Sequence, residues 1–530
     1  MSPNSIYKRL KSQSLSKVDS KANQYRVAVQ VGHCSISLGV NEVVDTFITY
    51  LRSNAYLVIT GCDGSCFNGP QVIITSPNGD TVRIPHVDGG IAIRLSTLLE
   101  GNMSPLKFKD DLNGFISKQT RVVLDGCGEL DAINLSEYVS NNGYYGLSKA
   151  VSMSPEDAIE VVKDSGLRGR GGAYFPTALK WYGARKAAGK QKYIVVNSEE
   201  GEPGLFKDRH LMEGVPHKII EGALIAAYAV GASNIFLYIN AEANLSYERM
   251  EAAIEEIRSG GLLENGVLGS GWPVNIELRR GAGGYVCGEE TTLLNTMEGY
   301  RREPRLRPPF PTESGFLDSP TIINNAETLA TLPYIFANPI SDFKSIGNVN
   351  HIGTKLISMS GAVSRRGLAE VPFGTTLRYI IESIGGGLPE GRTLQAIAVG
   401  GPSSGLLPPA LIDTKLVPGT LHEAGIILGA GGVIILDETI PIIDTIRHLA
   451  AYNSVESCGK CTPCREGTPK LVEIIDKFMD GKFTQADLKE IYNLAKVIET
   501  SSLCGLGQAA GNPIFSMLRF FSNELVVKAE

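Results

Sequence analysis

The sequence predicts a multidomain α/β protein that ends in a helical segment. Its 530 residues are enough for roughly three to five domains, each able to bury a core. Residues 150–344 alternate strand-like and helical segments, which favours a parallel sheet covered by helices. After Asp437 the strand signals stop and helical patterns continue. These three observations together define the predicted fold class.

Composition indicates a globular protein whose partners are proteins and small molecules. The hydrophobic content of 43% and charged content of 20% are ordinary. A net charge of −6 and a pI near 5.8 argue against a nucleic-acid binder, which normally has a basic patch. No apolar run reaches the roughly 18 residues of a membrane span, and the first residues lack a secretory signal's apolar core. We expect a cytoplasmic protein without nucleic acid or a direct membrane span.

The amino-terminal part is predicted to hold a small α/β module between two less regular segments. Residues 1–24 are rich in Lys and Ser and are expected to form a flexible or docking arm, with an organellar transit peptide as the alternative. Residues 25–103 follow a β-α-β-β-α order, with helices expected over 41–53 and 91–99. This module contains Cys34, Cys62 and Cys66. Residues 104–149 are expected to connect it to the next domain.

The remaining chain is predicted to form three further domains. Ser154 precedes Pro and acidic residues, which indicates a helix start. It opens the 150–344 domain, where helices are expected over 221–230 and 245–257. Residues 345–436 predict a small α+β module with one helix near Thr376. Residues 437–530 predict a helical domain, with helices over 441–452, 469–478 and 484–499.

Four cysteines near the end of the chain predict a metal centre. Cys458, Cys461 and Cys464 lie in S-C-G-K-C-T-P-C, and Cys504 follows in a distant segment. Two-residue gaps let one tight loop present three thiolates to a [4Fe–4S] cluster while a remote cysteine completes the cage. A structural zinc site is the alternative, although zinc usually uses separate C-x2-C pairs. Disulfides fit poorly in a long chain with nine cysteines.

A glycine-rich segment at residues 166–181 predicts a phosphate-binding loop. Gly169, Gly171 and Gly172 lie in G-L-R-G-R-G-G, and Arg170 and Lys180 add positive charge. Successive backbone N–H groups in such a loop can surround a phosphate. The spacing matches neither a Walker loop nor the strand, G-x-G-x-x-G, helix order of a dinucleotide fold. A tight structural turn therefore remains the alternative.

Two acidic segments point to the same site. Residues 197–209 begin with N-S-E-E-G-E-P-G directly after a predicted strand, where open α/β sheets place ligands. Their three glutamates would repel each other unless a ligand or cations lay nearby; a solvated acidic loop is the alternative. Residues 281–292, G-A-G-G-Y-V-C-G-E-E-T-T, repeat the pattern, although Glu289 and Glu290 could simply stabilise a helix start.

Taken together, these motifs resemble one protein family. The runs G-R-G-G-A-x-F-P-T, N-x-E-E-x-E-P-G-x-F-K-D-R, Y-V-C-G-E-E-T, P-R-L-R-P-P-F-P and P-T-I-I-N-N-A-E-T occur in order before the cysteine set. They resemble the NADH-binding flavoprotein subunit of respiratory complex I and its soluble relatives. Those relatives serve NAD-linked hydrogenases, formate dehydrogenases and electron-bifurcating complexes. The resemblance covers about residues 145–530.

The resemblance implies a fold for each domain. Residues 25–103 would be a thioredoxin-like module, and residues 150–344 a Rossmann-like FMN-binding α/β domain. Residues 345–436 would be a ubiquitin-like β-grasp module of the soluble-ligand-binding type. Residues 437–530 would form a helical bundle that holds the [4Fe–4S] cluster.

The resemblance also implies roles for individual residues. Glu202 and Glu290 would lie near the nicotinamide, and Phe175 and Phe310 would sandwich the adenine of NADH. Cys458, Cys461, Cys464 and Cys504 would hold the [4Fe–4S] cluster. The FMN site would comprise Gly169, Arg170, Gly171, Gly172, Lys180, Asn197, Glu199, Glu200, Tyr285, Gly288, Glu289, Ile323, Asn324, Asn325 and Thr328.

The implied activity is that of a diaphorase-type subunit. FMN would exchange a hydride with NAD(H) and pass single electrons through the [4Fe–4S] cluster, with the protein supplying orientation and electrostatics. The implied partners are a thioredoxin-like [2Fe–2S] subunit and a larger iron–sulfur or catalytic subunit, so electrons are expected to leave through another polypeptide. The alternative is a non-catalytic or nucleotide-deficient iron–sulfur scaffold.

Some residues depart from the family pattern. Tyr174 and Ala178 stand where the family has glycines, and Tyr174 is expected to narrow the nicotinamide pocket. Arg307 replaces a common lysine. The amino-terminal module keeps a C-x3-C pair but offers only Cys34 upstream, so we expect it to be degenerate and empty, with a [2Fe–2S] cluster at Cys34, Cys62 and Cys66 as the alternative. Cys127 and Cys287 are predicted to be packing or near-site residues.

Overall fold

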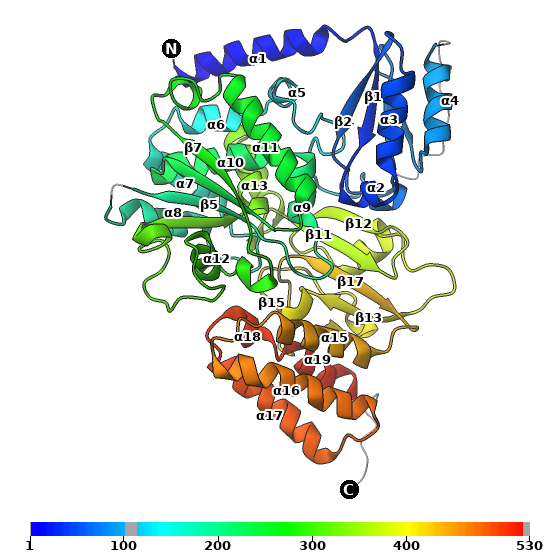
Figure 1. Ribbon diagram of the computed structural model, residues 1–530, viewed down its shortest axis with the longest axis vertical. Coiled ribbons are helices and arrows are strands. Elements are labelled where there is room, and N and C mark those ends of the chain that lie inside the picture. Colours follow the sequence, from blue (N-terminus) through cyan, green and yellow to red (C-terminus); the bar gives the residue numbers. More distant parts are fainter. Residues whose placement is uncertain (1, 101–113, 190, 523–530) are drawn as a thin grey trace.

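The computed structural model describes residues 2–100, 114–189 and 191–522. Four regions follow one another along the chain in Figure 1: a small α/β module (blue), a central α/β domain (cyan to green), a second β-rich module (yellow) and a group of helices (orange to red). A mixed α/β multidomain architecture with a helical carboxyl end is therefore confirmed.

The amino-terminal module is a four-stranded sheet with helices packed against it. Its strands are β1 (Tyr25–Gln30), β2 (Ala55–Thr60), β3 (Val72–Thr75) and β4 (Thr81–Ile84), and its helices α2 (His33–Ser37), α3 (Val40–Tyr50) and α4 (Gly89–Glu100). The strand order is β2-β1-β3-β4, with β1 parallel to β2 and antiparallel to β3. The apolar residues of β1 pack with Val40, Val43 and Phe47 of α3.

The first residues differ from the expected flexible arm. Helix α1 (Pro3–Asp19) begins at Ser2, whose side chain accepts a hydrogen bond from the Ser5 backbone. It lies against two short helices, α5 (Leu135–Ser140) and α6 (Tyr145–Ala150). Tyr7 is buried there and its ring lies 5.5 Å from that of Tyr145. An aromatic anchor, which the Lys- and Ser-rich composition hid, attaches this helix to the central domain.

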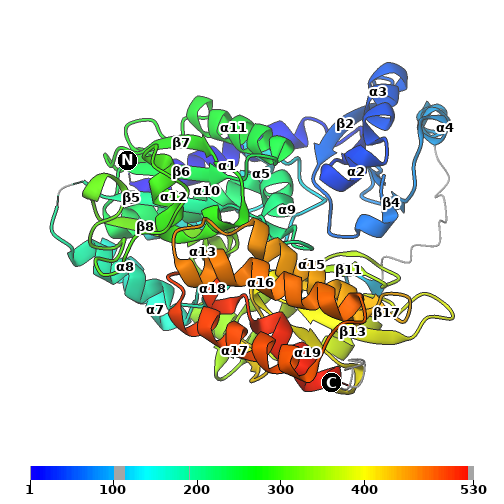
Figure 2. The ribbon, with the colours of Figure 1, turned by 60° about the horizontal axis from the view of Figure 1, so that its bottom comes forward.

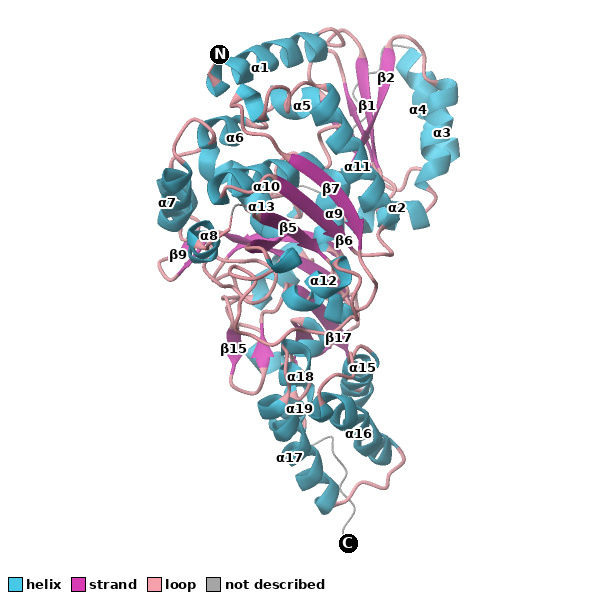
Figure 3. Cartoon of the chain, turned by 60° about the vertical axis from the view of Figure 1, so that its left-hand side comes forward, coloured by secondary structure: helices cyan, strands magenta, loops and turns pink. Residues whose placement is uncertain are grey.

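The central domain is built on a parallel sheet in the order β7-β6-β5-β8. The strands are β5 (Tyr193–Ser198), β6 (Asn234–Ile239), β7 (Asn275–Arg280) and β8 (Thr321–Asn325). Its helices are α7 (Pro155–Ser165), α8 (Thr177–Lys186), α9 (Lys207–Gly214), α10 (Pro216–Val230), α11 (Asn244–Ser259), α12 (Glu290–Met297), α13 (Ala326–Ala337) and α14 (Ile340–Lys344). Figure 3 shows the strands lying among these helices. The predicted alternation of strands and helices is confirmed.

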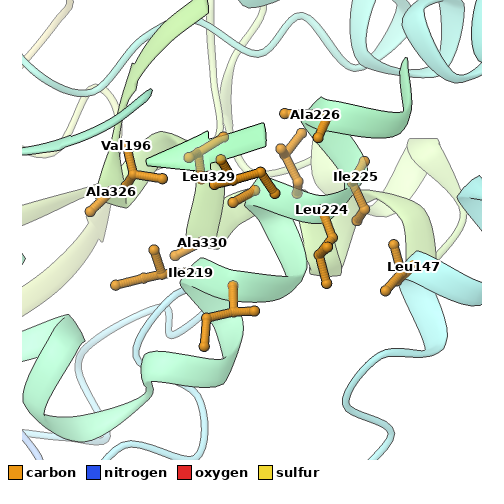
Figure 4. Close-up of a cluster of buried hydrophobic side chains, with 14 of the residues drawn as sticks. Leu147, Val196, Ile219, Leu224, Ile225, Ala226, Ala326, Leu329 and Ala330 are labelled. Carbon is orange, nitrogen blue, oxygen red and sulfur yellow. The ribbon is translucent and has the colours of Figure 1, made fainter. Parts of the chain in front are cut away.

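Both faces of this sheet are buried, which explains the nearly continuous apolar strands. Ile194 and Val196 of β5 point to the face covered by α10 and α13, where Figure 4 shows Val196 near Ala326 and Leu329. Val195 points to the opposite face and packs with Leu293 and Leu294 of α12. The sheet is therefore rigid, and its strand ends provide fixed positions for polar side chains.

The second β-rich module surrounds a five-stranded sheet in the order β12-β11-β17-β13-β14. These strands are β11 (Thr354–Gly361), β12 (Gly367–Pro372), β13 (Leu394–Val399), β14 (Leu406–Leu407) and β17 (Gly432–Asp437); two small hairpins are β9 (Gly347–Asn348) with β10 (His351–Ile352), and β15 (Thr420–His422) with β16 (Ile426–Ile427). The helix expected near Thr376 is a π-helix over Tyr379–Ile384. The predicted α+β character is confirmed.

Helices form the carboxyl end, as predicted. They are α15 (Ile442–Val455), α16 (Thr462–Met479), α17 (Gln485–Ser501), α18 (Gly505–Ala509) and α19 (Asn512–Phe520), and Figure 2 brings them forward. Helix α16 begins seven positions before the expected start at Pro469, because Cys461 is its N-cap and Pro463 lies in its first turn. This difference places Cys464 on a helix.

Candidate functional site

A cavity of about 560 Å³ lies where three regions of the chain meet. Asn197 and Asn325 line it from the carboxyl ends of adjacent strands β5 and β8, the edge at which parallel sheets bind ligands. The β-rich module and helices α18 and α19 close it from the other side. Its volume is within the range of roughly 300–1,000 Å³ that small-molecule sites occupy.

The glycine-rich loop forms one wall of this cavity. Gly171 and Gly172 line it, and Gly172 has a φ of +118°, which side chains rarely adopt. A Cβ on Gly171 would lie 3.1 Å from the Cβ of Asn325. Gly169 is not at the wall; its N–H donates to the Phe175 carbonyl at 2.9 Å and closes the loop. The loop thus presents bare backbone to the cavity.

Arg170 differs from the expected phosphate ligand. Its side chain is 1% exposed, and its guanidinium donates to the backbone carbonyls of Arg168, Ile352 and Thr354 at 2.7–3.2 Å. Its own N–H donates to Oγ1 of Thr328 at 2.8 Å. Arg170 and Thr328 therefore hold the loop in place from behind instead of facing the cavity.

The three glutamates of residues 197–209 line the same cavity, with Glu200 and Glu202 buried and Glu199 half-buried. Burial raises the pKa of Glu199, Glu200 and Glu202 to about 7. Glu200 accepts hydrogen bonds from the backbone of Asp208 and Arg209 at the start of α9. One carboxylate oxygen of Glu199 and one of Glu202 have no hydrogen-bond partner among the described residues. These unpaired buried atoms are suited to a ligand.

A buried lysine lies below these acidic groups. Lys207 is fully buried, and its Nζ donates to Asp208 at 2.7 Å and to Asn325 at 3.1 Å. It also lies 3.3 Å from Glu327, which pairs with buried Lys355. This network offsets the negative charge around the cavity. Lys207 belongs to the F-K-D-R run, to which the sequence alone assigned no role.

Glu290 lies outside the cavity and joins two segments of the central domain. Its carboxylate lies 2.8 Å from Lys180 Nζ and 3.1 Å from Arg307 Nη1. Burial would raise the pKa of Glu290, but Lys180 and Arg307 outweigh it and the pKa falls below its ordinary value. Lys180 also donates to the Ile323 carbonyl at 2.8 Å. The predicted aromatic pair, Phe175 and Phe310, is on these two segments, with both rings about half exposed.

Some of the other predicted residues line the cavity, and the rest pack behind the residues that line it. Tyr285, Gly288 and Glu289 line the cavity, and Glu289 also caps α12 by accepting from the Thr291 and Thr292 backbone, so the helix-stabilising alternative is confirmed for it. Asn324 is buried and accepts from the Trp181 indole. The side chain of Ile323, in β8, packs on the face of the sheet that is covered by α12.

Tyr174 does not narrow the cavity, contrary to expectation. It is 3% exposed, packs against Phe373 of the β-rich module, and its hydroxyl donates to the Gly429 carbonyl at 2.8 Å. Gly429 does line the cavity. Tyr174 therefore supports the wall from outside, and Ala178 is buried in the core of the central domain.

Sequence reasoning missed several other cavity residues. Ala173, Gly201, Leu205, Asp208 and Val286 lie inside the predicted motifs but were not singled out. The others come from distant segments: Gly400, Ser403, Ile427, Gly429, Ala430, Gly505, Leu506, Gln508, Ala509 and Asn512. The glycine clusters near residues 400 and 430 were the available signal, but no spacing rule links them to β5.

The four carboxyl-terminal cysteines surround a second, smaller cavity. Cys461 and Cys504 are the N-cap residues of α16 and α18, and Cys464 lies in the first turn of α16. No three of these four thiols lie within 4.8 Å of one another. Four thiolates about 2.3 Å from one zinc ion would be separated by only about 3.8 Å. Their spread favours the larger cage of a cluster over zinc.

The two cavities share a wall. Val286 and Leu506 line both of them and pack with Cys464 and Cys504. The backbone N–H of Tyr285 donates to Glu456, just before the cysteine loop, at 2.6 Å. A ligand in the large cavity would thus be separated from the cysteine site by two apolar side chains.

Comparison with known proteins agrees with this geometry. Residues 162–334 match the family model described as the Nuo51 FMN-binding domain, and residues 444–528 match the iron–sulfur binding region of NADH-ubiquinone oxidoreductase-F. The chain is 43% identical to the NADP-reducing hydrogenase subunit HndC of Solidesulfovibrio fructosivorans over 77% of this chain and 83% of that one. It belongs to this flavoprotein family.

Other relatives extend the likeness. An NADH-quinone oxidoreductase subunit of Rhizobium meliloti is 42% identical over 75% of this chain and 94% of its own. A crystal structure of an NAD+-reducing [NiFe]-hydrogenase in the H2-reduced state superposes with a TM-score of 0.69 at 30% identity, covering 96% of this chain and 84% of that one. As a family member, the chain is an electron-transferring oxidoreductase subunit of a multisubunit complex, with an FMN-binding domain and a 4Fe–4S-binding region.

The flavoprotein subunit has a second group of cysteines in its amino-terminal module. Cys34, Cys62 and Cys66 line one small cavity together with His210 of α9. Cys127 is buried nearby, and its thiol donates to the Cys62 carbonyl at 3.1 Å, while Cys287 is buried beside β6; both are packing residues, as predicted. Among the helices that the structure describes, none is long and apolar enough to cross a bilayer.

Proposed function

We propose that this chain is a diaphorase-type subunit. It exchanges a hydride with NAD(H) through FMN bound in the large cavity, and passes single electrons to a [4Fe–4S] cluster at Cys458, Cys461, Cys464 and Cys504. The observation that carries the proposal is the wall of Val286 and Leu506 between the two cavities, because a flavin and a cluster on its two sides would be close enough to exchange electrons.

The residues of the cavity suit FMN. Gly171 and Gly172 expose backbone on which a phosphate can bind. Unpaired oxygens of Glu199 and Glu202 are available for the polar edge of a flavin, and Asn197 lines the same cavity. Since the pKa of each glutamate is raised to about 7, part of their charge is neutralised near neutral pH. That lowers the repulsion of a phosphorylated ligand.

When bound, FMN supplies both the hydride chemistry and the single-electron chemistry of this class of enzyme. The chain's own residues position the reactants. The amide of Asn197 is held by the Gly288 carbonyl at 2.8 Å, and Asn240 holds Glu199 at 2.7 Å. Such fixed partners orient ligands without a general base.

We place NAD(H) between the glycine-rich loop and the proline-rich segment. Phe175 and Phe310 are half exposed, as the two faces of an adenine site would be in the absence of nucleotide. Glu290 connects their segments through Lys180 and Arg307, so we assign it a positioning role, while Glu202 borders the nicotinamide end.

The proposal extends to domains and partners. The β2-β1-β3-β4 sheet of residues 25–103 is compatible with a thioredoxin-like module, and the five-stranded sheet of residues 345–436 with a β-grasp module. We expect residues 150–344 and 437–530 to be the FMN-binding and cluster-binding units. A thioredoxin-like [2Fe–2S] subunit and a larger iron–sulfur or catalytic subunit would complete the electron path, as suits a relative of hydrogenase and quinone-reductase subunits.

The alternative is a scaffold that retains the cluster but has lost nucleotide binding. Tyr174 would have favoured this alternative by narrowing the nicotinamide pocket, but its side chain lies outside the cavity and donates a hydrogen bond to Gly429. The enzyme is therefore the better supported of the two functions.

Anaerobic purification followed by NADH titration tests the proposal. We expect one FMN per chain, rapid loss of flavin absorbance on addition of NADH, and reduction of an artificial dye. A protein without flavin, or with flavin that NADH does not bleach, would be a scaffold instead.

A further inference from the structure

A second group of metal-binding side chains lies between the amino-terminal module and the central domain. The thiols of Cys62 and Cys66 and a ring nitrogen of His210 lie within 4.8 Å of one another. The thiol of Cys34 contacts that of Cys66 but lies outside this compact group. All four side chains line the same small cavity. Three thiols and one imidazole thus converge from two domains.

His210 has the features of a metal ligand. It is 4% exposed, and its Nε2 has no hydrogen-bond partner among the described residues. Its ring also contacts the backbone of Cys62. Histidines that bind metals commonly use one ring nitrogen for the metal and direct the other to a backbone carbonyl or carboxylate. Leaving a buried ring nitrogen unpaired is unfavourable, and a bound metal would remove that penalty.

Close backbone contacts hold the two halves of this site together. A Cβ on Gly61, next to Cys62, would lie 2.2 Å from Cα of Gly214 at the end of α9. A Cβ on Gly64 would lie 2.3 Å from the Leu368 carbonyl oxygen in β12. Only glycine allows both approaches. The loop that carries Cys62 and Cys66 is therefore in close contact with both the central domain and the β-rich module. These contacts fix its position against His210.

The surroundings suit negatively charged thiolates. The Gly64 N–H donates to Sγ of Cys62 at 3.4 Å, a type of contact that tunes iron–sulfur clusters. His33 contacts the Cys34 thiol, and its Nδ1 lies 3.0 Å from Glu213. Ser246 in turn donates to Glu213 at 3.1 Å. Because Glu213 already engages His33, His210 is the imidazole left for a metal.

We propose that Cys34, Cys62, Cys66 and His210 bind a [2Fe–2S] cluster, with the histidine of the central domain replacing a fourth cysteine. Two irons need four terminal ligands, and histidine serves in this role in other [2Fe–2S] centres. Three of the donors, Cys62, Cys66 and His210, are closer together than any three carboxyl-terminal thiols, whereas Cys34 stands apart from them. This intermediate spread suits two irons better than one zinc ion, whose four ligands would be equally close.

The site lies near the large cavity. Asp208 lines that cavity and precedes His210 by two positions on α9, so the cluster ligand is within about one helical turn, or about 5.4 Å along the axis, of the cavity wall. A [2Fe–2S] cluster accepts and returns one electron without making or breaking a bond to the protein. Binding of the cluster does not depend on the proposed flavin activity.

Metal analysis and EPR of the full chain test this assignment. Wild-type protein, purified anaerobically, should contain two more iron and two more sulfide per chain than the Cys66→Ser variant, and no zinc. Pulsed EPR of the reduced [2Fe–2S] signal should show coupling to a directly bound nitrogen. The His210→Cys variant should retain iron and lose that coupling, whereas His210→Ala should lose the signal.

Cys127→Ser is the matched control, because it alters a buried neighbour whose hydrogen bond to the Cys62 carbonyl a hydroxyl preserves; iron content should not change. FMN and the [4Fe–4S] signal, measured on the same samples, should persist in every variant, which separates this test from that of the proposed function. Zinc in place of iron, equal iron in wild type and Cys66→Ser, or nitrogen coupling that persists in His210→Cys would each overturn the assignment.

Discussion

The two cysteine-rich sites of this protein differ in where their ligands come from. The carboxyl-terminal site takes four thiols from helix ends of one region, and the spacing of three of them already predicts a metal centre. The amino-terminal site combines three thiols of one module with His210 of another. A ligand set that one segment supplies can be found in sequence, whereas one assembled between domains becomes visible only in the fold.

The sites also differ in their relation to the large cavity. The carboxyl-terminal site shares Val286 and Leu506 with it, while the amino-terminal site is connected to it through helix α9. Under the proposed function, the first arrangement is a direct exit for electrons. The proposed [2Fe–2S] cluster would lie to one side of that exit and hold an electron there.

The largest expected effect comes from removing the direct exit. Cys504→Ser deletes the proposed cluster ligand at the N-cap of α18, and we expect loss of the [4Fe–4S] EPR signal and a fall of at least roughly 100-fold in NADH-driven reduction of an iron–sulfur acceptor. The FMN content should remain, as should reduction of a dye that accepts electrons from flavin. Cys127→Ser is the control with both activities intact. If Cys504→Ser reduced the iron–sulfur acceptor at the wild-type rate, electrons would not leave through the proposed [4Fe–4S] cluster.

The next largest effect concerns the cavity between the two sites. Gly172→Ala forces a residue with a side chain into a φ of +118°, and a strain of roughly 1–3 kcal/mol should weaken FMN binding by about five- to 150-fold. Fluorescence titration with FMN measures this. Gly79→Ala strains a turn with a similar φ of +88° and open space around the Cβ, so it should lower stability without changing FMN affinity. Equal FMN affinities in both variants would contradict the proposal that the glycine-rich loop binds FMN.

A smaller effect should appear in the dependence of stability on pH. Burial raises the pKa of Glu202 from 4.5 to about 7, so the folded state holds a proton that the unfolded chain has released. Its stabilising contribution is complete below pH 4.5 and is lost as pH rises through about 7. In FMN-free protein, the free energy of unfolding of the wild type should therefore fall by roughly 1–3 kcal/mol between about pH 5 and about pH 8, relative to that of Glu202→Gln. Denaturant titration measures this, and a pH-independent difference would show that Glu202 is not buried as described.

The smallest effect is expected at Tyr174. Tyr174→Phe removes only the hydrogen bond to the Gly429 carbonyl, which should cost about 1 kcal/mol of stability. Because the ring lies outside the cavity, the KM for NADH should change less than about twofold. Steady-state kinetics and thermal melting measure the two quantities. A large change in the KM for NADH with no change in stability would instead show that Tyr174 lies in the nucleotide-binding pocket.

Local sequence patterns predicted the elements that local forces determine. The apolar run of β5 and the Ser154 N-cap identify their elements. Helix α1 was missed because its attachment depends on Tyr7, whose partner Tyr145 is remote in sequence. The start of α16 was missed because a proline inside the helix, Pro469, resembled a helix start.

The candidate site was predictable to the extent that its residues lie in motifs. Gly171, Asn197 and Glu202 were expected at the cavity and lie there. The sequence could not predict that the Arg170 side chain points away from the cavity, because the backbone carbonyls that it binds, those of Ile352 and Thr354, belong to another module. His210 offered no sequence signal at all, since a single histidine in F-K-D-R-H gains meaning only when α9 meets Cys62.

The central claim, that the large cavity delivers electrons across the shared wall to the carboxyl-terminal cluster, is tested most directly by low-temperature EPR after anaerobic addition of NADH. The account predicts a reduced [4Fe–4S] signal in proportion to the chains that hold FMN, and no such signal in flavin-depleted Gly172→Ala. Bleaching of the flavin by NADH with no reduced [4Fe–4S] signal in wild type would contradict it.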